Sequence, residues 1–419
     1  MSDPTTESVQ DFRLRARDWL KANMLSKEEA PEWNAMSISP EQAERARELQ
    51  AKLFQAEFAG LYFPREYGGQ GLDREYQTAF TEESSPYEMP LLFNTPTLTI
   101  IAPLILEMGT EEQKQHLSKM ISGEELWVQF MSEPSGGSDM AGCQTRATFD
   151  GENYLLNGSK IWSSYAYFSD YAVCLARTDW DAVKHQGLTM FIVKIHQPGI
   201  TVNQIRQSDG STEFCQEFFD DVPLPLDDIV GKPNDGWTSA QCLLMHERAS
   251  TGGSSPYASG TAGTQKAPID DLIQLARGNG KVPDEYSRQL LAETYINQTV
   301  QSQLVGRVIA ATNEGTLPPT SGALLKLFSG KNSTRRATIA MELAGVHGAV
   351  FPAAEQKTPG VNTAAANRFI FRQASCLGGG SSEIQRNIIS ERILGMPREL
   401  AGDRGVPYKD VKKSATREN

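Results

Sequence analysis

The segment Cys376–Arg398, CLGGGSSEIQRNIISERILGMPR, places three glycines directly before a helical pattern. Ser382 and Gln385 fit the S-x-x-Q capping box, which predicts Ser382 as the N-cap, and Gly395 ends the run. Glycines before a capped helix let backbone N–H groups approach an anion or a planar ring closely. By pattern alone, a flexible loop before an ordinary amphipathic helix is an equally good interpretation.

Composition limits the classes of protein to which this chain can belong. Its 419 residues suggest two or three packed subdomains, with 39% hydrophobic and 22% charged content. The net charge of −12, without a basic block, argues against nucleic acid and anionic membrane surfaces as partners. The longest apolar stretch, Leu91–Met108, contains Asn94, Pro96 and Pro103, so a membrane span is not expected.

The N-terminus and the cysteines indicate a cellular compartment. The first twelve residues lack the apolar segment of a secretory signal, so we expect a cytoplasmic protein. The five cysteines are scattered, without a C-x-x-C pair or a nearby histidine cluster. We therefore expect free thiols and no metal site.

The hydrophobic period changes twice along the chain. Residues 1–123 follow a helical period, residues 124–238 alternate as strands do, and residues 239–398 return to helices. The pairs Asp150-Gly151 and Asn157-Gly158 predict two successive hairpin turns. The charged tail, 399–419, is expected to be poorly ordered.

Three motifs together resemble one enzyme family. GGGSSEIQRNIISERILGMPR resembles the C-terminal signature of the acyl-CoA dehydrogenases, flavoenzymes that desaturate acyl-CoA thioesters between Cα and Cβ. QFMSEPSGGSDMAGCQTRA (129–147) resembles their flavin-binding segment, and NGSKIWSS (157–164) resembles their N-G-x-K-x-W strand. The resemblance covers 11–398. It implies an α+β fold with an N-terminal helical domain, a middle antiparallel β-barrel domain, a C-terminal four-helix bundle, and FAD as cofactor.

The resemblance also implies which residues hold the cofactor. Gln129, Met131 and Ser132 would line the flavin, and Ser138 would touch the flavin and the CoA-side ligand. Trp162 would cover the flavin's edge, and Ser164 would donate a hydrogen bond near N5. The full set implied for FAD is Gln129, Met131, Ser132, Ser138, Trp162, Ser163, Ser164, Glu342, Gly345, Ser381 and Glu383.

The segment 341–348, MELAGVHG, departs from the family pattern. Most members have glutamine where this chain has Glu342, and contact the ADP portion of the flavin across a subunit interface. A carboxylate at that place would repel a pyrophosphate. The family's R-x-x-F-G motif, a further pyrophosphate donor, is absent, and Arg277 or Arg288 is a possible substitute.

Dehydrogenation needs a carboxylate to remove the α-proton. Many members carry that glutamate where this chain has Gly379, which cannot act as a base. Others carry it in a Glu-Arg pair on the first C-terminal helix, and here Glu247-Arg248 matches. The resemblance therefore implies Glu247 as the base, Arg248, Gly379, Gly380 and Ser138 as substrate contacts, and Gly379 as leaving room for the base. Without the resemblance, Glu247 would be read as a solvated helix residue.

These residues lead to one hypothesis and two alternatives. We expect FAD-dependent dehydrogenation of an acyl-CoA to the 2-enoyl-CoA, with electrons passed to an electron-transfer flavoprotein. The small-residue loop 249–268 and Gly379 favour a bulky, branched or ring-bearing acyl group. The family implies a homo-oligomer (dimer or tetramer) or a hetero-oligomer with a related subunit. The alternatives are a catalytically silent subunit of such a complex and an acyl-CoA oxidase.

Overall fold

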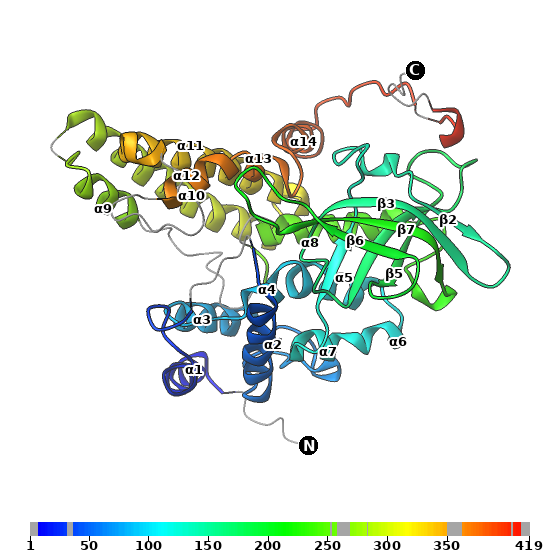
Figure 1. Cartoon of the computed structure of the whole chain (residues 1–419), viewed down its shortest axis with the longest axis horizontal. Coiled ribbons are helices and arrows are strands. Elements are labelled where there is room, and N and C mark those ends of the chain that lie inside the picture. The colour runs from blue at the N-terminus through cyan, green and yellow to red at the C-terminus, as the bar shows by residue number, and fades with distance from the viewer. Residues whose placement is uncertain are drawn as a thin grey trace.

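The computed structural model describes residues 7–31, 37–251, 254–257, 269–282, 284–349, 363–403 and 405–411. Figure 1 shows a helical N-terminal region, a sheet, and a helical C-terminal region that follow one another along the chain. This order confirms the predicted fold class. The predicted domain limits after residues 123 and 238 remain predictions; the last N-terminal helix ends at Ser122 and the first C-terminal helix begins at Gly236.

The N-terminal helices begin where the sequence provides caps. Ser39 accepts from the N–H of Gln42, whose side chain returns a bond to the Ser39 N–H, and Thr110 makes the same capping box with Gln113. The α-helices are α1 (Val9–Asn23), α2 (Pro40–Gln55), α3 (Arg74–Ser84), α4 (Leu91–Phe93), α5 (Ala102–Met108), α6 (Glu111–Lys114) and α7 (His116–Ser122).

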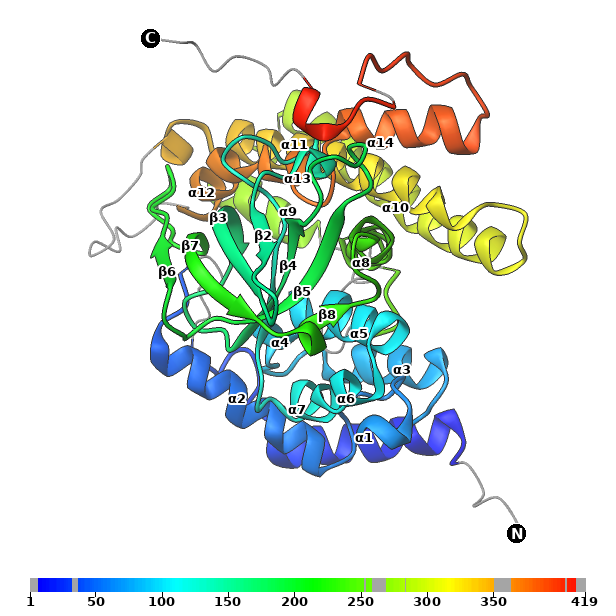
Figure 2. The same ribbon diagram turned by 90° about the vertical axis from the view of Figure 1, so that its right-hand side faces the viewer.

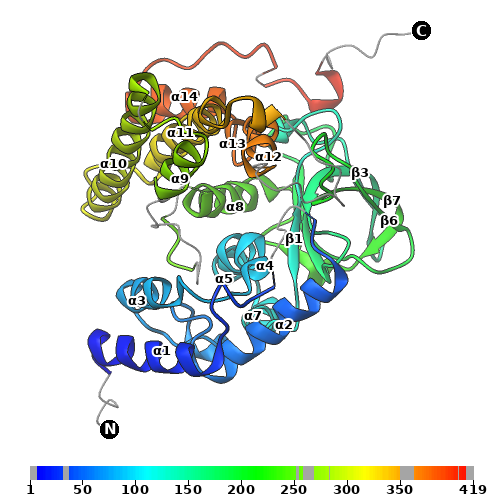
Figure 3. The ribbon, with the colours of Figure 1, turned by 60° about the vertical axis from the view of Figure 1, so that its left-hand side comes forward.

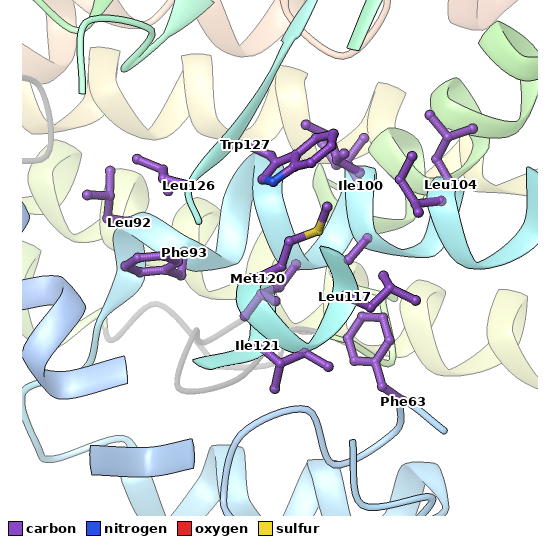
Figure 4. Close-up of a cluster of buried hydrophobic side chains, with 14 of the residues drawn as sticks. Phe63, Leu92, Phe93, Ile100, Leu104, Leu117, Met120, Ile121, Leu126 and Trp127 are labelled. Carbon is purple, nitrogen blue, oxygen red and sulfur yellow. The ribbon is translucent and has the colours of Figure 1, made fainter. Parts of the chain in front are cut away.

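The apolar stretch Leu91–Met108 forms the centre of this region. It is long and apolar enough to cross a membrane by length and composition, but 72% of it is buried inside the protein. Figure 4 shows side chains of this stretch in one buried cluster with Trp127, the first residue of β1. The stretch is therefore a core element that joins the helical region to the sheet.

The middle region is one eight-stranded sheet. Its order is β6-β7-β3-β2-β4-β5-β8, and β1 pairs with β4. The strands are β1 (Trp127–Phe130), β2 (Arg146–Phe149), β3 (Tyr154–Ser164), β4 (Tyr171–Arg177), β5 (Leu188–Lys194), β6 (Ile200–Gln204), β7 (Phe214–Leu224) and β8 (Ile229–Val230). The prediction of a purely antiparallel domain was wrong, because β1 runs parallel to β4. No short hairpin turn joins β1 to β4, so the connection does not force the two strands to be antiparallel.

The two glycine signals in this region have different outcomes. Asp150-Gly151 turns the chain between β2 and β3, as predicted. Asn157-Gly158 does not turn the chain; it lies inside β3, where the pairing with β7 shifts register. Gly158 has φ +137°, and a Cβ there would lie 2.9 Å from the Thr145 Cα. The glycine therefore allows a bulge and a close backbone approach, and a hairpin is not required to explain it.

The C-terminal region is helical and surrounds α11. Figure 3 shows α8 between the N-terminal helices and the other C-terminal helices. The α-helices are α8 (Gly236–Thr251), α9 (Asp270–Gly278), α10 (Glu285–Asn313), α11 (Gly322–Ala344), α12 (Thr363–Phe371), α13 (Ala374–Leu377) and α14 (Ser382–Ile388). Much of the predicted small-residue loop, 252–253 and 258–268, lies outside the described residues.

The expected disorder of the tail was wrong for the part that the structure describes. Tyr408 is buried, and its hydroxyl donates to the carbonyl of Gly142 at 2.5 Å. Its ring lies 3.6 Å from the guanidinium carbon of Arg177, a buried residue of β4. Figure 2 shows this segment, in red, beyond one end of the strands, and Tyr408 pairs there with Ala182 in the β4–β5 connection. Backbone hydrogen bonds from Tyr408 to the Ala182 carbonyl and from Lys409 to the Trp180 carbonyl also hold the segment, so the aromatic ring and backbone pairing anchor it together.

Candidate active site

The structure brings Glu247 to the end of β1. Glu247 lies on α8, and the Nε2 of Gln129, on β1, donates to its Oε1 at 3.5 Å. The two residues are far apart in sequence and lie on elements of different regions. The predicted base and a predicted flavin-lining residue are therefore neighbours. The motifs predict a role for each residue, but the sequence alone does not show that the two are in contact.

The surroundings of Glu247 favour the neutral acid over the carboxylate. The Glu247 side chain has intermediate exposure, and Gln129, Arg248 and Lys326 lie around it; we call the site that these four residues border the recess. Burial raises the pKa of Glu247, while the Gln129 hydrogen bond and the charges of Arg248 and Lys326 oppose that rise. A carboxylate with a raised pKa accepts a proton more readily, which suits a general base.

Lys326 is a residue of this recess that the sequence analysis missed. It lies on α11, is 8% exposed, and its Nζ donates to the carbonyl of Ser375 at 3.1 Å. Burial lowers the pKa of Lys326, and the charge of Glu247 opposes this. The available signal was a lysine within the apolar run Leu324–Phe328, because a buried lysine needs polar partners.

The glycine loop packs directly against this recess. Gly379 has φ +70°, and a Cβ there would lie 3.1 Å from the Lys326 Cε and 3.2 Å from the Thr251 Oγ1. Thr251 ends α8, one turn beyond Glu247, and its hydroxyl donates to the Glu247 carbonyl at 2.9 Å. The space at Gly379 is thus bordered by Thr251 and Lys326, with the carboxylate of Glu247 not among its nearest atoms.

The predicted cap of α14 was displaced by one residue. Ser381, not Ser382, is the N-cap, and its hydroxyl accepts from the Ile384 N–H at 3.3 Å. Gln385 is therefore free of the capping box, and its Nε2 donates to the carbonyls of Gly379 and Gly380, both at 3.1 Å. These two bonds hold the glycine loop in its left-handed conformation.

A buried ion pair joins the two sequence motifs of the sheet. The Lys160 Nζ lies 2.9 Å from the Glu133 Oε1 and donates to the Met131 carbonyl at 3.1 Å. Glu133 also accepts from the N–H groups of Gln144 at 2.7 Å and Thr145 at 2.8 Å. Although burial opposes it, Lys160 and these donors lower the pKa of Glu133 to about 2. The pair therefore fixes the turn that leaves β1 against β3.

Trp162 occupies a strained and exposed position on β3. It has φ +67° and lies where the pairing of β3 with β7 shifts register. Its side chain is 54% exposed, and its nearest aromatic partner is Phe214, edge-on at 5.8 Å. A large aromatic side chain turned outward at a bulge is suited to cover a planar ring, and a core role is excluded by its exposure.

The two serines after Trp162 have carboxylate partners that the sequence analysis missed. The Ser163 hydroxyl is buried and donates to Glu217 on β7, so the implied side-chain contact of Ser163 with FAD is not supported. The Ser164 hydroxyl donates to the Glu213 Oε1 at 2.9 Å. Burial raises the pKa of Glu217 to about 8 and raises that of Glu213. Cross-strand pairing places these carboxylates, and no local pattern marks them.

The segment around Glu342 is remote from Glu247. Glu342 lies sixteen residues after Lys326 on α11, roughly 24 Å along the helix axis. Its carboxylate lies 3.3 Å from Arg335 and accepts from the Tyr286 hydroxyl at 2.6 Å. The expected repulsion between Glu342 and a pyrophosphate is therefore reduced, because Arg335 already pairs with the Glu342 carboxylate.

Lys281 adds a second cation to this segment. Its Nζ donates to the Glu342 carbonyl at 2.8 Å and lies 3.4 Å from where a Cβ of Gly345 would be. Arg277 and Arg288, the substitutes considered from the sequence, are both exposed. Lys281 is the best placed of the three cations for an anion at Gly345. It is about sixty residues from the 341–348 motif in sequence, so the motif alone could not indicate it.

Three other predicted residues lie at the surface or at a cap. Ser138 is exposed in the turn after β1. Glu383 is exposed and pairs with Arg386 at 3.4 Å. Ser381 is engaged as the cap of α14. Nothing in the described contacts joins these three to the Glu247 recess.

The residues around β1 fit a flavin ring. The Gln129 Oε1 is buried and has no hydrogen-bond partner within the part of the chain that the structure describes. A buried acceptor of this kind needs a donor, and a ring N–H of a flavin can supply one. The Gln129 oxygen could bond to the edge of a flavin ring, and the outward-facing indole of Trp162 could cover a planar ring. Gln129 and Trp162 thus have the properties that a flavin ring would need, and the implied contacts of Met131 and Ser132 stay predictions.

Comparison with known proteins identifies three family models along the chain. The acyl-CoA dehydrogenase N-terminal domain matches residues 6–124, the middle domain 129–222, and the C-terminal domain 234–394. The acyl-CoA dehydrogenase IpdE1 of Mycobacterium tuberculosis is 32% identical over 411 residues, covering 94% of this chain and all of that protein. The IpdE1 of Mycolicibacterium smegmatis is 31% identical, covering 94% and 99%.

Solved structures share the same architecture. The Tcur3481-Tcur3483 steroid ACAD superimposes with a TM-score of 0.76 at 26% identity, covering 95% of this chain and 100% of that one. The ChsE4-ChsE5 complex from Mycobacterium tuberculosis gives a TM-score of 0.72 at 26% identity, covering 96% and 100%.

We predict that Lys160→Met destabilises the protein by about 3–5 kcal/mol, because it leaves the Glu133 carboxylate buried without its cation. Urea unfolding followed by tryptophan fluorescence measures this change. Lys21→Met, at an exposed position on α1, is the matched control and should stay within about 0.5 kcal/mol of the wild type. A Lys160→Met protein as stable as that control would show that the ion pair does not hold the two segments.

We predict that Glu217→Gln stabilises the protein increasingly as pH rises. The folded pKa of about 8 lies above the ordinary 4.5, so between these values the unfolded chain releases a proton that the folded chain keeps. Wild-type stability therefore falls across this window, by up to roughly 5 kcal/mol, whereas glutamine cannot titrate.

The measurement is the difference in Tm between variant and wild type at pH 5.5 and pH 8.5. Exposed Glu152→Gln, in the β2–β3 turn, is the control and should show an unchanging difference. A difference for Glu217→Gln that is equally flat would contradict a raised pKa at this position.

Proposed function

This chain belongs to the acyl-CoA dehydrogenase family, whose members bind FAD and oxidise the CH–CH bond of acyl-CoA thioesters, and we propose that Glu247 is its catalytic base. The observation that carries the proposal is the contact between Glu247 and Gln129 in a recess that raises the pKa of the carboxylate. A base on α8 that touches a flavin-lining side chain on β1 would face an acyl chain bound at the flavin.

Each residue of the recess has a defined task in this proposal. Bound FAD supplies a hydride acceptor for the β-hydrogen. Glu247 removes the α-proton, and the backbone N–H of Gly379 or Gly380 donates to the thioester carbonyl, which stabilises negative charge on that oxygen. Arg248, partly buried beside Glu247, contacts the acyl-CoA. A bound acyl-CoA would displace water from around Glu247 and Arg248, which strengthens each of these interactions.

We propose a bulky, ring-bearing acyl group as the substrate. Gly379 packs closely against Thr251 and Lys326, so no side chain projects from the glycine loop beside these two residues. One structural relative, 26% identical, is described as a steroid ACAD, which supports a fused-ring acyl group over a short straight chain. The proposed electron acceptor is an electron-transfer flavoprotein. An acyl-CoA oxidase remains the alternative, and oxygen consumption during turnover separates the two.

We propose that the working protein is an oligomer, either with itself or with a related subunit. Glu342 and Gly345 lie roughly 24 Å along α11 from Lys326, too far to serve the flavin beside Glu247 in the same chain. The long helix α10 exposes Ile296 and Val300, which lie four residues apart and therefore on one side of the helix. An exposed apolar side of this kind is suited to contact a second chain of this fold.

Further features bear on the oligomer's composition and compartment. The ChsE4-ChsE5 relative is a complex of two proteins, which supports the hetero-oligomeric form. A catalytically silent role for this chain is the alternative from a different class. All five cysteines are free, which agrees with a proposed location in the reducing cytoplasm.

We predict that the protein expressed alone binds FAD and that anaerobic acyl-CoA bleaches its absorbance. Glu247→Gln should retain the flavin spectrum but lose turnover by about 10²–10⁴-fold, because it removes the base with little change in volume. In the wild type, kcat/KM should fall as pH drops through the raised pKa of Glu247, since only the carboxylate can accept the proton.

The control for this experiment is Glu28→Gln, at an exposed position, which should match the wild type in spectrum and rate. Near-normal turnover in Glu247→Gln would eliminate Glu247 as the base. A colourless wild-type protein, or flavin that no thioester reduces, would favour the silent-subunit alternative.

We predict that ring-bearing acyl-CoA thioesters reduce the flavin faster than butyryl-CoA. A site shaped for a ring-bearing acyl group holds a short straight chain less firmly, so butyryl-CoA should lose orientation and rate. Stopped-flow bleaching with a panel of straight, branched and steroid-derived thioesters measures this. If butyryl-CoA gives the fastest rate, the proposal of a bulky substrate fails.

A further inference from the structure

Three side chains that can bind a metal converge on the side of α8 facing α5. Cys242 and His246 are separated by four residues on α8, so they share one helix face. Glu107, near the end of α5, faces them from the N-terminal region. No metal site was expected from the sequence, because the cysteines are scattered. The Cys-x-x-x-His spacing is a local signal for two ligands on one helix face, whereas only the folded chain brings Glu107 beside them.

The geometry of this cluster matches a single ion. The Cys242 Sγ lies 3.3 Å from the Glu107 Oε2, and the His246 Nε2 lies 2.9 Å from the Glu107 Oε1. The ligand atoms of all three residues lie within 4.8 Å of one another. Ions such as Zn²⁺ bind sulfur at about 2.3 Å and nitrogen or oxygen at about 2.0–2.2 Å, so tetrahedral ligands stand roughly 3.3–3.7 Å apart. Small side-chain movements would therefore suffice.

The charges and the access also suit a divalent cation. A thiolate, a carboxylate and a neutral imidazole carry a total charge of −2, which one divalent ion neutralises. No lysine or arginine is paired with Glu107 among the described residues; its ion pair there is with His246. His246 is buried whereas Glu107 is exposed, so an ion would be covered by protein on the His246 side and reachable from solvent on the Glu107 side.

We propose that Glu107, Cys242 and His246 bind one divalent cation of the Zn²⁺ class, with a water molecule in the fourth position. Binding forms one metal–sulfur bond and releases the thiol proton of Cys242 to solvent; no electron is transferred. Mixed sulfur, nitrogen and oxygen ligands favour Zn²⁺ over Mg²⁺ or Ca²⁺, which prefer oxygen alone.

The cation would act as a clip between two regions of the chain. It joins α5 to α8 one residue before Glu247, and adjacent residues on a helix point about 100° apart. The metal side of α8 therefore differs from the side that meets Gln129. The role is to position α8, not to take part in the chemistry, so this inference stands or falls independently of the proposed function.

The test uses the full-length protein as purified, stripped with a chelator and titrated with Co²⁺, which reports thiolate ligation by an intense charge-transfer absorption in the near ultraviolet. We expect one equivalent of Co²⁺ to produce this band and Zn²⁺ to displace it. Zn²⁺ should also raise Tm, because a ligand that binds only the folded state stabilises it.

Matched variants assign the signal. Cys242→Ser should abolish the band, and His246→Gln should weaken Zn²⁺ binding by more than about tenfold, a loss above 1.4 kcal/mol. Cys376→Ser, at the other partly exposed cysteine, should behave as the wild type. Circular dichroism confirms that each variant is folded. A wild type without the band, or a folded Cys242→Ser that retains it, overturns the proposal and leaves a hydrogen-bonded cluster without metal.

Discussion

The buried pair of Lys160 and Glu133 is the interaction on which the sheet end of the recess depends. Two charges removed from water are stable only when each is fully compensated. Glu133 receives the ammonium and two backbone N–H groups, and Lys160 reaches the Met131 carbonyl. A second link, from the Ile161 N–H to the Ser132 carbonyl at 2.9 Å, continues the contact. The end of β1 and the outward turn of Trp162 are thereby held in one geometry.

From this fixed edge, α8 connects all three regions. It packs against the apolar stretch of the N-terminal region, presents Glu247 to β1, and ends at Thr251 beside the glycine loop. Its position therefore controls the distance between base and flavin-lining residues. A cation at Cys242 and His246 would restrain the helix at one side, while Lys326 faces it from α11 at another. A recess built from three regions needs several such restraints because none of its walls is continuous in sequence.

The distribution of charged residues along α11 supports the proposal that one chain does not complete the site by itself. The helix carries Lys326 near its start and Glu342 near its end, and the rigid rod between them keeps the two apart. Arg335 near the far end already pairs with Glu293 and Glu342, whereas Lys281, within the described part of the chain, donates only to a carbonyl there, so its charge suits an anionic group. Exposed Ile296 and Val300 on α10 would add apolar surface to the proposed association.

The sequence by itself determined the order of the regions, the family and the nature of the recess residues. Local periodicity and caps specify helices and strands, and the motifs that contain Gln129, Glu247 and Gly379 can be recognised in the linear sequence. Tertiary structure alone decided the rest. The bulge at Asn157-Gly158, the parallel pairing of β1, the partners of Ser163 and Ser164, and the position of Lys326 arise from contacts between distant segments. Cross-strand and interhelical contacts have no local sequence period, so only the folded chain reveals them.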